Sequence, residues 1–389
     1  MARYDAIVLG LGAVGSASLY QLAKRGARVL GIDRYSPPHA FGSTHGESRV
    51  TRLAIGEGAH YSPLALRSHE IWRELEAKTG ASLLTTNGGL IISGATSRAT
   101  FHGASFFSNT IEAARRHKIP HELFDAKQIR QRYPQFAIAD EQSGYFEPSA
   151  GFVRPEECIR VQLDLAEEHG AEIHRNQTVT GFAQVGDGIA VTTKAGRFEA
   201  AQLIVAAGPW LPGLLAANYS RHFKVYRQTL HWFDVEASHD QFTPERFPIF
   251  IWELPHARGG IYGFPAIDGR RGGIKIATEQ FEATTTPESV SRDVTAAEST
   301  SVYRDLVAPH FPAVGPRCVK SAVCLYTVTN DFGFVVDRHP DFERVVIASP
   351  CSGHGFKHSA ALGEAIAGLT LDRKSRFDLS AFSFARFDR

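Results

Sequence analysis

The chain is poor in cysteine, in charge of one sign and in long apolar segments. Its 389 residues include four cysteines, Cys158, Cys318, Cys324 and Cys351, and no CxxC pair, which argues against a disulfide scaffold or a cysteine-bound metal. The formal net charge of +1 gives no electrostatic basis for binding nucleic acid or an anionic membrane surface. No apolar run approaches the roughly 20 residues that span a bilayer. We therefore expect a cytoplasmic protein without nucleic-acid, membrane or metal partners.

Glycine and aromatic residues, by contrast, are abundant. There are 35 glycines, aromatic residues make up 11% of the chain and hydrophobic residues 43%. This composition is typical of a large α/β protein with tight turns around a buried ligand. A chain of 389 residues is long enough for two domains. Because a strand pattern begins within a few residues of the N-terminus, no signal peptide is expected.

A strand, a helix and a second strand open the chain. Residues 4–9 form a short apolar run, Ala17–Arg25 has helical spacing, and Ala27–Ile32 has the pattern of a buried strand. A βαβ unit of this kind requires a parallel sheet, with the crossover helix on one face.

The loop of this unit has the spacing of a dinucleotide-binding motif. Gly10, Gly12 and Gly15 form GxGxxG. The glycines permit a tight turn, close approach of the backbone to a pyrophosphate, and packing of the helix on the strand. Asp33, at the end of the second strand, would accept hydrogen bonds from a ribose. The motif predicts dinucleotide binding but does not separate NAD from FAD.

The rest of the chain alternates helical and strand patterns. Helices are expected at 64–78, 111–117, 155–170 and 359–369, and strands at 88–93, 172–174, 189–193, 203–207 and 344–348. Aromatic-rich alternating strands at 225–233, 249–253 and 260–264 are expected to form a different, antiparallel sheet. The predicted fold class is α/β, or α+β overall: a Rossmann-type domain of several segments with an inserted, mainly antiparallel domain.

Two further turns admit two interpretations each. Ala207, Gly208 and Trp210 follow a buried strand, and this segment either passes close to a cofactor or forms an ordinary turn. The segment 352–357 precedes the last helix, where backbone N–H groups can stabilise negative charge on a ligand. A flexible turn explains that segment equally well.

The basic residues and one cysteine also admit a structural and a functional interpretation. Arg49 and Arg52 lie in the polar stretch 37–58, as solvated surface or as part of a site. Lys275 lies in the apolar strand 273–277, where a buried ammonium would need a partner or a chemical role. Cys324, taken alone, is a buried apolar thiol.

Together these segments resemble the family of monomeric sarcosine oxidase and N-methyltryptophan oxidase over most of the chain. The resemblance lies in Gly42–Arg52 (GSTHGESRVTR), Tyr262–Pro265 (YGFP), Ala322–Thr327 (AVCLYT) and Ser352–Lys357 (SGHGFK). It implies a Rossmann-type FAD-binding domain of residues 1–85, 145–222 and 320–389. The inserted substrate domain would comprise residues 86–144 and 223–319.

The resemblance also implies a covalent FAD and an amine oxidase site. Cys324 matches the cysteine that forms the 8α-S-cysteinyl bond to the flavin, and His45 and Arg49 match residues beside the flavin ring. Arg52 and Lys357 match the two partners of the substrate carboxylate, a physically reasonable clamp. The remaining correspondences are Lys275 for oxygen activation, Tyr262 and Tyr326 for the pocket walls, and, for cofactor binding, Gly10, Gly12, Ala13, Val14, Gly15, Asp33, Arg34, Ser43, Thr44, Val179, Ala207, Gly208, Trp210, Gly353, His354, Gly355 and Phe356, with Arg49 and Lys357 again.

Two departures from the family pattern bear on the substrate. Glu279 replaces a pocket histidine, and Ile55 replaces a tyrosine. A carboxyl group at 279 favours a substrate with a second cationic or polyhydroxylated group, unless the loop register is shifted. The implied reaction is oxidation of a C–N bond of a small amino-acid-like secondary amine, with O2 reduced to H2O2, by a monomer.

The alternatives differ in substrate, in acceptor or in class. A glycated amino acid or a cyclic imino acid would also satisfy the clamp. A flavin dehydrogenase would pass electrons to an acceptor other than oxygen. A non-catalytic nucleotide-binding scaffold would be colourless or would hold its nucleotide loosely. An NAD enzyme would share the glycine motif but would not need Cys324.

Overall fold

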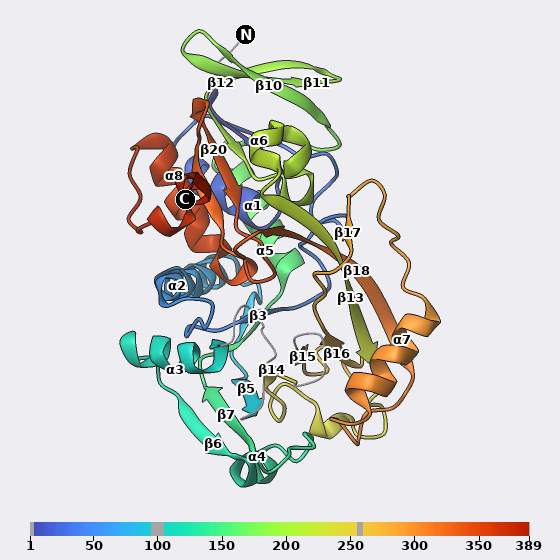
Figure 1. Cartoon of the computed structure of the whole chain (residues 1–389). Coiled ribbons are helices and arrows are strands. Elements are labelled where there is room, and N and C mark those ends of the chain that lie inside the picture. Colours follow the sequence, from blue (N-terminus) through green and yellow to red (C-terminus); the bar gives the residue numbers. More distant parts are fainter. Residues whose placement is uncertain (1–3, 95–104, 255–259, 389) are drawn as a thin grey trace.

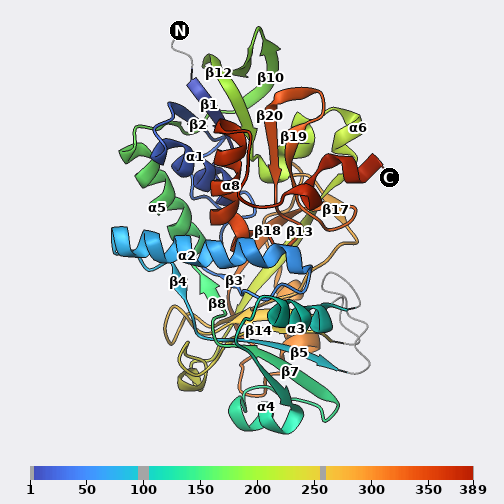
Figure 2. The same ribbon diagram turned by 90° about the vertical axis from the view of Figure 1, so that its left-hand side faces the viewer.

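The protein folds around two large β-sheets at opposite ends of the molecule, as the computed structural model in Figures 1 and 2 shows. The structure describes residues 4–94, 105–254 and 260–388. Within these ranges no helix is both long and apolar enough to cross a membrane. A small third sheet consists of β3 (Arg49–Thr51), β8 (Gly151–Val153) and β4 (Leu84–Thr85). In sequence, these strands occur where the chain passes from one large sheet to the other.

The eight-stranded sheet contains the predicted βαβ unit. Its order is β10-β11-β12-β1-β2-β9, and β20 pairs with β12 and with β19. β1 runs parallel to both β2 and β12, so the carboxyl ends of these strands meet at one edge. The strands are β1 (Tyr4–Leu9), β2 (Val29–Ile32), β9 (Glu172–His174), β10 (Val179–Val185), β11 (Gly188–Thr193), β12 (Gly196–Val205), β19 (Val335–His339) and β20 (Phe342–Ser349).

The nine-stranded sheet is mainly antiparallel. Its order is β17-β13-β16-β15-β14-β5-β7-β6, with β18 paired to β13. Among the residues that the structure describes, β14 and β5 are the one parallel pair of this sheet. The strands are β5 (Gly89–Gly94), β6 (Glu122–Asp125), β7 (Gln142–Glu147), β13 (Phe223–Phe233), β14 (Ile249–Trp252), β15 (Ile261–Phe264), β16 (Ile274–Ala277), β17 (Thr284–Thr285) and β18 (Cys318–Thr329).

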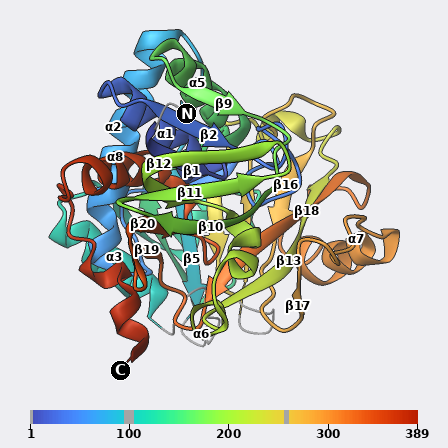
Figure 3. The same cartoon turned by 90° about the horizontal axis from the view of Figure 1, so that it is seen from above.

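Helices cover the eight-stranded sheet and the middle of the molecule. α1 contacts both α5 and α8, and α2 contacts α8; seen from above, β10–β12 lie over this layer (Figure 3). Gly363 of α8 packs so closely on α1 that an added Cβ would lie 2.5 Å from the Cβ of Ala17. The α-helices are α1 (Ala13–Lys24), α2 (Ser62–Thr79), α3 (Phe106–Arg116), α4 (Ala126–Arg132), α5 (Pro155–Glu168), α6 (Ala217–Ser220), α7 (Ala296–Val302) and α8 (Ser359–Leu371).

The predicted fold class is confirmed, and most predicted elements are present with shifted ends. α3 begins at Phe106 rather than at 111, and β12 begins at Gly196 rather than at 203. The polar stretch 37–58, for which no helix or strand was predicted, contains the short strand β3. The domain division remains a prediction. Its boundaries at 145 and 320 fall within β7 and β18, and both strands pair within the nine-stranded sheet.

Candidate functional site

The glycine loop turns tightly at the carboxyl edge of the parallel strands. Gly10 has φ +84°, and an added Cβ would lie 2.5 Å from the carbonyl oxygen of Ala206. A Cβ on Gly15 would lie 1.7 Å from the carbonyl oxygen of Gly10, so only glycine lets α1 start here. At Gly12 the nearest atom to such a Cβ is Thr44 Oγ1 at 3.6 Å. Gly12 therefore leaves the space beside the first turn of α1 open.

Asp33 braces this loop from the end of β2. Its Oδ2 accepts a hydrogen bond of 2.7 Å from the backbone N–H of Leu11, and its Oδ1 accepts one of 2.8 Å from that of Tyr35. Its side chain is buried, and His39 Nε2 lies 3.6 Å from Oδ1. The carboxylate thus fixes the backbone around the glycine loop as well as facing the cavity described next.

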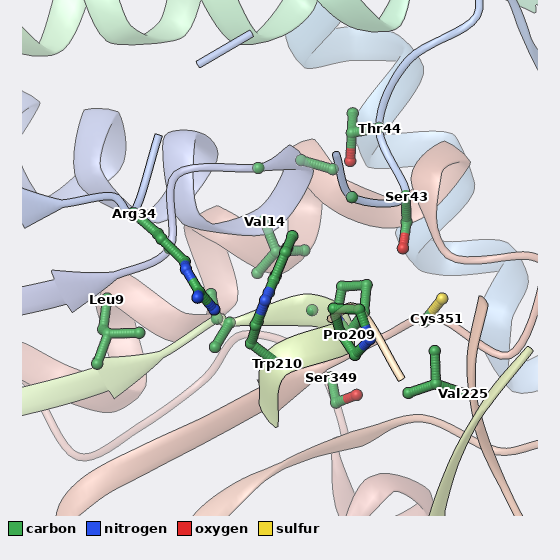
Figure 4. Close-up of a pocket in the computed structure, with 18 of the residues that line it drawn as sticks. Leu9, Val14, Arg34, Ser43, Thr44, Pro209, Trp210, Val225, Ser349 and Cys351 are labelled. Atoms are coloured by element: carbon green, nitrogen blue, oxygen red, sulfur yellow. The ribbon is translucent and has the colours of Figure 1, made fainter. Parts of the chain in front are cut away.

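A cavity of about 780 Å³ extends from this loop toward the nine-stranded sheet. Figure 4 shows Arg34 and Trp210 side by side in one part of the cavity, and Ser43 and Cys351 in another. β13 and the segment 284–288 also contribute to its wall. The predicted cofactor residues that line it are Gly10, Gly12, Ala13, Val14, Asp33, Arg34, Ser43, Thr44, Arg49, Val179, Ala207, Gly208, Trp210, Gly353, Gly355 and Phe356.

Arg49 and Cys324 meet at the far end of this cavity. Arg49 Nη2 donates to the carbonyl oxygen of Ser43 at 2.9 Å and lies 3.5 Å from Cys324 Sγ. Burial raises the pKa of the Cys324 thiol, whereas the positive charges of Arg49 and Lys275 lower it. Cys324 is not among the residues that line the cavity, but its neighbours Ser43 and Arg49 are. The pKa of the Cys324 thiol is raised overall by burial, and Arg49 is the foremost group that opposes this rise.

His45 is buried beside the same cations. Burial first, and then Arg49 and Lys275, lower its pKa to about 3, so the ring is neutral at neutral pH. Its Nε2 has no hydrogen-bond partner among the described residues. A neutral imidazole next to two cations adds polarity without adding positive charge.

Lys275 is buried and does not lie on the solvent face of its strand. Its side chain is 1% exposed, and its Nζ donates to the carbonyl oxygens of Gly46 at 2.8 Å and Ser48 at 2.7 Å. Nζ also lies 4.0 Å from the centre of the Phe264 ring. Burial and then Arg49 hold the pKa of Lys275 well below its usual range.

A second, smaller pocket of about 70 Å³ adjoins the large cavity and shares Arg49, Tyr326, Gly353 and Phe356 with it. Arg52 and Lys357, the predicted carboxylate partners, both line this pocket and are both buried. Its remaining lining residues are Val50, Glu57, Phe106, Ile251, Tyr262, Glu279 and His354.

A buried carboxylate, Glu57, lies among the cations of the small pocket. Its Oε2 is 2.5 Å from Arg52 Nη2, and its Oε1 is 3.8 Å from Lys357 Nζ and from His354 Nδ1. No role was predicted for Glu57 from the sequence. The sequence feature that could have identified it is a carboxylate between two glycines, close to Arg49 and Arg52.

Glu279 and two tyrosines form another part of the pocket wall. The hydroxyl groups of Tyr262 and Tyr326 are 3.2 Å apart. Burial, and then the charge of Glu57, raise the pKa of Glu279 to about 8, whereas a hydrogen bond with Tyr326 and the charge of Lys357 lower it. Burial, opposed mainly by Glu57, lowers the pKa of Lys357 to about 8. The pocket therefore offers cations, hydroxyl groups and a carboxyl group that is neutral at neutral pH.

Comparison with known proteins identifies the family. Residues 5–369 match the family described as DAO, FAD dependent oxidoreductase. The chain belongs to the FAD-dependent oxidoreductase family. This assignment excludes the NAD enzyme and the non-catalytic scaffold as descriptions of the chain.

Within this family, the chain is similar to two curated relatives and to one solved structure. The monomeric sarcosine oxidase of Streptomyces avermitilis is 37% identical over 381 residues, which are 97% of this chain and 96% of that protein. The N-methyl-L-tryptophan oxidase of Yersinia pestis is 35% identical over 386 residues, or 99% of each chain. NikD, an unusual amino acid oxidase essential for nikkomycin biosynthesis, has a TM-score of 0.82 over 98% of each chain at 24% identity, which shows a shared fold. The resemblance read from the motifs is confirmed.

The residues of this oxidoreductase fit FAD. The cavity volume lies in the range of cofactor sites, and the first turn of α1 provides N–H groups for a pyrophosphate where Gly12 leaves space. Of the predicted cofactor residues, Gly15 packs α1 against the loop instead of lining the cavity, and His354 and Lys357 line the small pocket. Pattern analysis missed Cys351, which lines the cavity and whose Sγ accepts a hydrogen bond from Thr327 N at 3.3 Å.

Proposed function

We propose that this oxidoreductase oxidises the C–N bond of a small secondary amine of the amino-acid type and passes the electrons to O2. One observation carries the proposal: a pocket with two buried cations, Arg52 and Lys357, shares Arg49 and Tyr326 with the large cavity. A substrate carboxylate held by the two cations would place the amine beside that shared wall. The names of the two curated relatives, a sarcosine oxidase and an N-methyl-L-tryptophan oxidase, support an N-methylated amino acid.

The carboxylate clamp begins with a partner already in place. Because Glu57 lies 2.5 Å from Arg52, an incoming carboxylate competes with Glu57 for the guanidinium. Arg52 offers a planar fork of donors, whereas Lys357 is a point charge. Lys357 Nζ also donates to the carbonyl oxygen of His354 at 2.6 Å, which keeps it directed toward the loop before α8.

The amine would lie near Tyr262, Tyr326 and Glu279. When bound, FAD would supply a two-electron acceptor, so that the substrate loses a C–H bond and becomes an imine that water hydrolyses. The tyrosine hydroxyl groups and the neutral carboxyl group of Glu279 would hydrogen-bond the uncharged amine and keep bulk water away.

We also propose that Cys324 holds FAD through an 8α-S-cysteinyl bond and that Lys275 assists oxygen reduction. Arg49 beside Cys324 Sγ favours the thiolate that such a bond requires. The fixed charge of Lys275 would stabilise the negative charge that develops on O2 as it is reduced to H2O2. That the protein acts as a monomer in the cytoplasm remains a prediction.

A screen for released peroxide tests the reaction. Purified protein is mixed with sarcosine, N-methyl-L-tryptophan, a cyclic imino acid and a fructosyl amino acid, and peroxide is measured against oxygen consumed. We expect peroxide in a 1:1 ratio with oxygen for at least one secondary amino acid. Flavin reduction by the amine without peroxide would instead identify a dehydrogenase with another acceptor.

A second candidate substrate class is a glycated amino acid. The observation that favours it is Glu279, a buried carboxyl group in the small pocket. A carboxyl group can bind the hydroxyl groups of a sugar as well as an amine. Faster oxidation of the fructosyl amino acid than of either N-methyl compound would favour this substrate class.

Acid precipitation tests the covalent bond separately from the reaction. We expect the yellow colour to stay with the precipitated protein, and a peptide containing Cys324 to carry the mass of FAD. In Cys324→Ser the colour should pass into the supernatant. Colour in the supernatant of the wild type would contradict the tether while leaving the oxidase assignment to the peroxide screen.

A further inference from the structure

A single peptide unit lies between a carboxylate and the buried ammonium of Lys275. Glu156 Oε1 accepts hydrogen bonds from the backbone N–H groups of Gly46 at 2.7 Å and Glu47 at 3.2 Å. Lys275 Nζ donates to the carbonyl oxygen of Gly46 at 2.8 Å. The Gly46 carbonyl and the Glu47 N–H belong to the same planar trans peptide, in which they point in opposite directions. The peptide therefore connects Glu156 on one side to Lys275 on the other.

The order carboxylate, peptide, ammonium is electrostatically favourable. The N–H end of the peptide dipole faces the negative charge and its C=O end faces the positive charge. The ammonium makes its second hydrogen bond, of 2.7 Å, to the carbonyl oxygen of Ser48 in the same loop. Any movement of this loop would therefore displace both acceptors of Lys275 together.

Burial and the charge of Arg49 favour the neutral form of Lys275, and a nearby carboxylate opposes them. Burial and the charge of Arg49 lower the pKa of Lys275, and His45 lies close enough to feel its charge. Glu156 is the foremost group that raises this pKa, followed by the Cys324 thiol and Asp268. If Cys324 carries the flavin, its thiolate no longer contributes, and Glu156 becomes more important.

Helix capping alone does not explain the placement of Glu156. An acidic residue in the first turn of α5 is favoured by the helix dipole, and Glu157 satisfies the same preference. The carboxylate of Glu157, however, pairs with Arg160 at 2.7 Å on the surface of α5. Glu157 therefore provides a neighbouring control with the same charge in the same first turn of α5.

We propose that Glu156 is a positioning residue for Lys275, which fixes the Gly46–Glu47 peptide and keeps the ammonium charged for reaction with oxygen. This role rests on the proposed function, since it takes Lys275 as the group that assists oxygen reduction. Glu156 itself contacts neither cavity, so it acts through the loop.

Reoxidation of the reduced holoenzyme tests the role. Protein reduced with dithionite is mixed with oxygenated buffer over a range of pH, so that no amine substrate is involved. In the wild type the rate should fall as the pH rises through the pKa of Lys275. In Glu156→Gln the loss of a negative charge lowers that pKa, so the fall should occur at lower pH, and the maximum rate should drop on the order of tenfold. Glu156→Asp, which keeps the charge, should keep the wild-type pH dependence.

Amide hydrogen exchange provides a readout independent of reaction rate. In Glu156→Gln the amides of Gly46 and Glu47 should exchange faster, because the amide group of glutamine is a weaker acceptor than a carboxylate. Glu157→Gln should change neither the exchange nor the pH dependence of reoxidation.

Two results would overturn the role, and they are distinguishable. An unshifted pH dependence in Glu156→Gln, in a protein where Lys275→Met slows reoxidation, would reduce Glu156 to an anchor of the loop. If Lys275→Met itself left reoxidation unchanged, the oxygen step of the proposed function would fail, and the role of Glu156 with it.

Discussion

Glu279 and Lys357 are two titratable side chains of the small pocket whose pKa values burial moves toward each other. Both pKa values are about 8, the first raised and the second lowered. Below that pH the pocket holds a neutral carboxyl group and an ammonium. Above it, the pocket gains a negative charge and loses a positive one.

This convergence predicts how carboxylate binding depends on pH. Acetate, titrated into the holoenzyme and followed by flavin absorbance, should bind progressively more weakly as the pH rises through about 8. In Glu279→Gln the loss should be less steep, because only Lys357 still titrates. Acetate binding that strengthens above this pH would contradict the placement of the clamp.

Lys275 carries the second prediction at the scale of one residue. Lys275→Met keeps most of the volume and removes the charge, so reoxidation of the reduced enzyme should slow on the order of a hundredfold. Reduction by the amine, measured without oxygen, should change much less, since Arg52 and Lys357 are unaltered. Equal slowing of both half-reactions would indicate general disruption of the site instead.

At the scale of elements, the glycine loop and α1 depend on one close contact. A Cβ at position 15 would lie 1.7 Å from the backbone oxygen of Gly10 and cannot be relieved by a side-chain rotation. Gly15→Ala should therefore lower the free energy of unfolding by at least about 3 kcal/mol and reduce flavin content. Gly181→Ala, with no atom within 4 Å of its added Cβ, is the control, and denaturant unfolding measures both.

A glutamate of strand β7 supports the backbone that follows Arg52. Glu147 is 1% exposed, and its carboxylate accepts hydrogen bonds from the backbone N–H groups of Leu53 at 2.7 Å and Ala54 at 3.1 Å. The carbonyl oxygen of Ala54 in turn accepts from Arg52. Glu147→Gln should weaken acetate binding about tenfold, as expected for disturbing a hydrogen bond to a charged group. An unchanged acetate affinity would show that Arg52 keeps its place without this support.

At the scale of the whole molecule, both large sheets contribute to the wall of the FAD cavity. Binding of FAD should therefore stabilise both sheets against unfolding. In Cys324→Ser, where FAD is exchangeable, the unfolding temperature should rise with FAD concentration. At one hundred times the dissociation constant the gain should be about 2.7 kcal/mol. A transition that splits in two, with one half insensitive to FAD, would show that the sheets unfold independently.

Much of this architecture is predictable because it is encoded locally. The βαβ unit, its glycines and the aromatic strands follow from spacing within a few residues. The element ends are less predictable, since packing decides them: Phe106, 1% exposed, extends α3 beyond its helical pattern, and pairing with β11 extends the polar start of β12.

The candidate site divides in the same way. The motifs identify its cations, but not the carboxylates that hold them. Glu156 meets Gly46 across 110 residues of sequence, and Glu147 meets Leu53 across 94. Neither glutamate differs, in sequence, from any acidic residue at a helix start or a strand end. Only the folded chain distinguishes them.

The segment from His45 to Glu57 carries Arg49, which lines both cavities, and Arg52 and Glu57, which line the small pocket, on one uninterrupted stretch of chain. Recombination at its flanks would consequently transfer cofactor-facing and substrate-facing groups to a homologous scaffold in a single exchange. Such a chimaera should retain their arrangement only in a recipient that already has acidic side chains matching Glu147 and Glu156. These two distant positions therefore decide whether the segment from His45 to Glu57 can be exchanged.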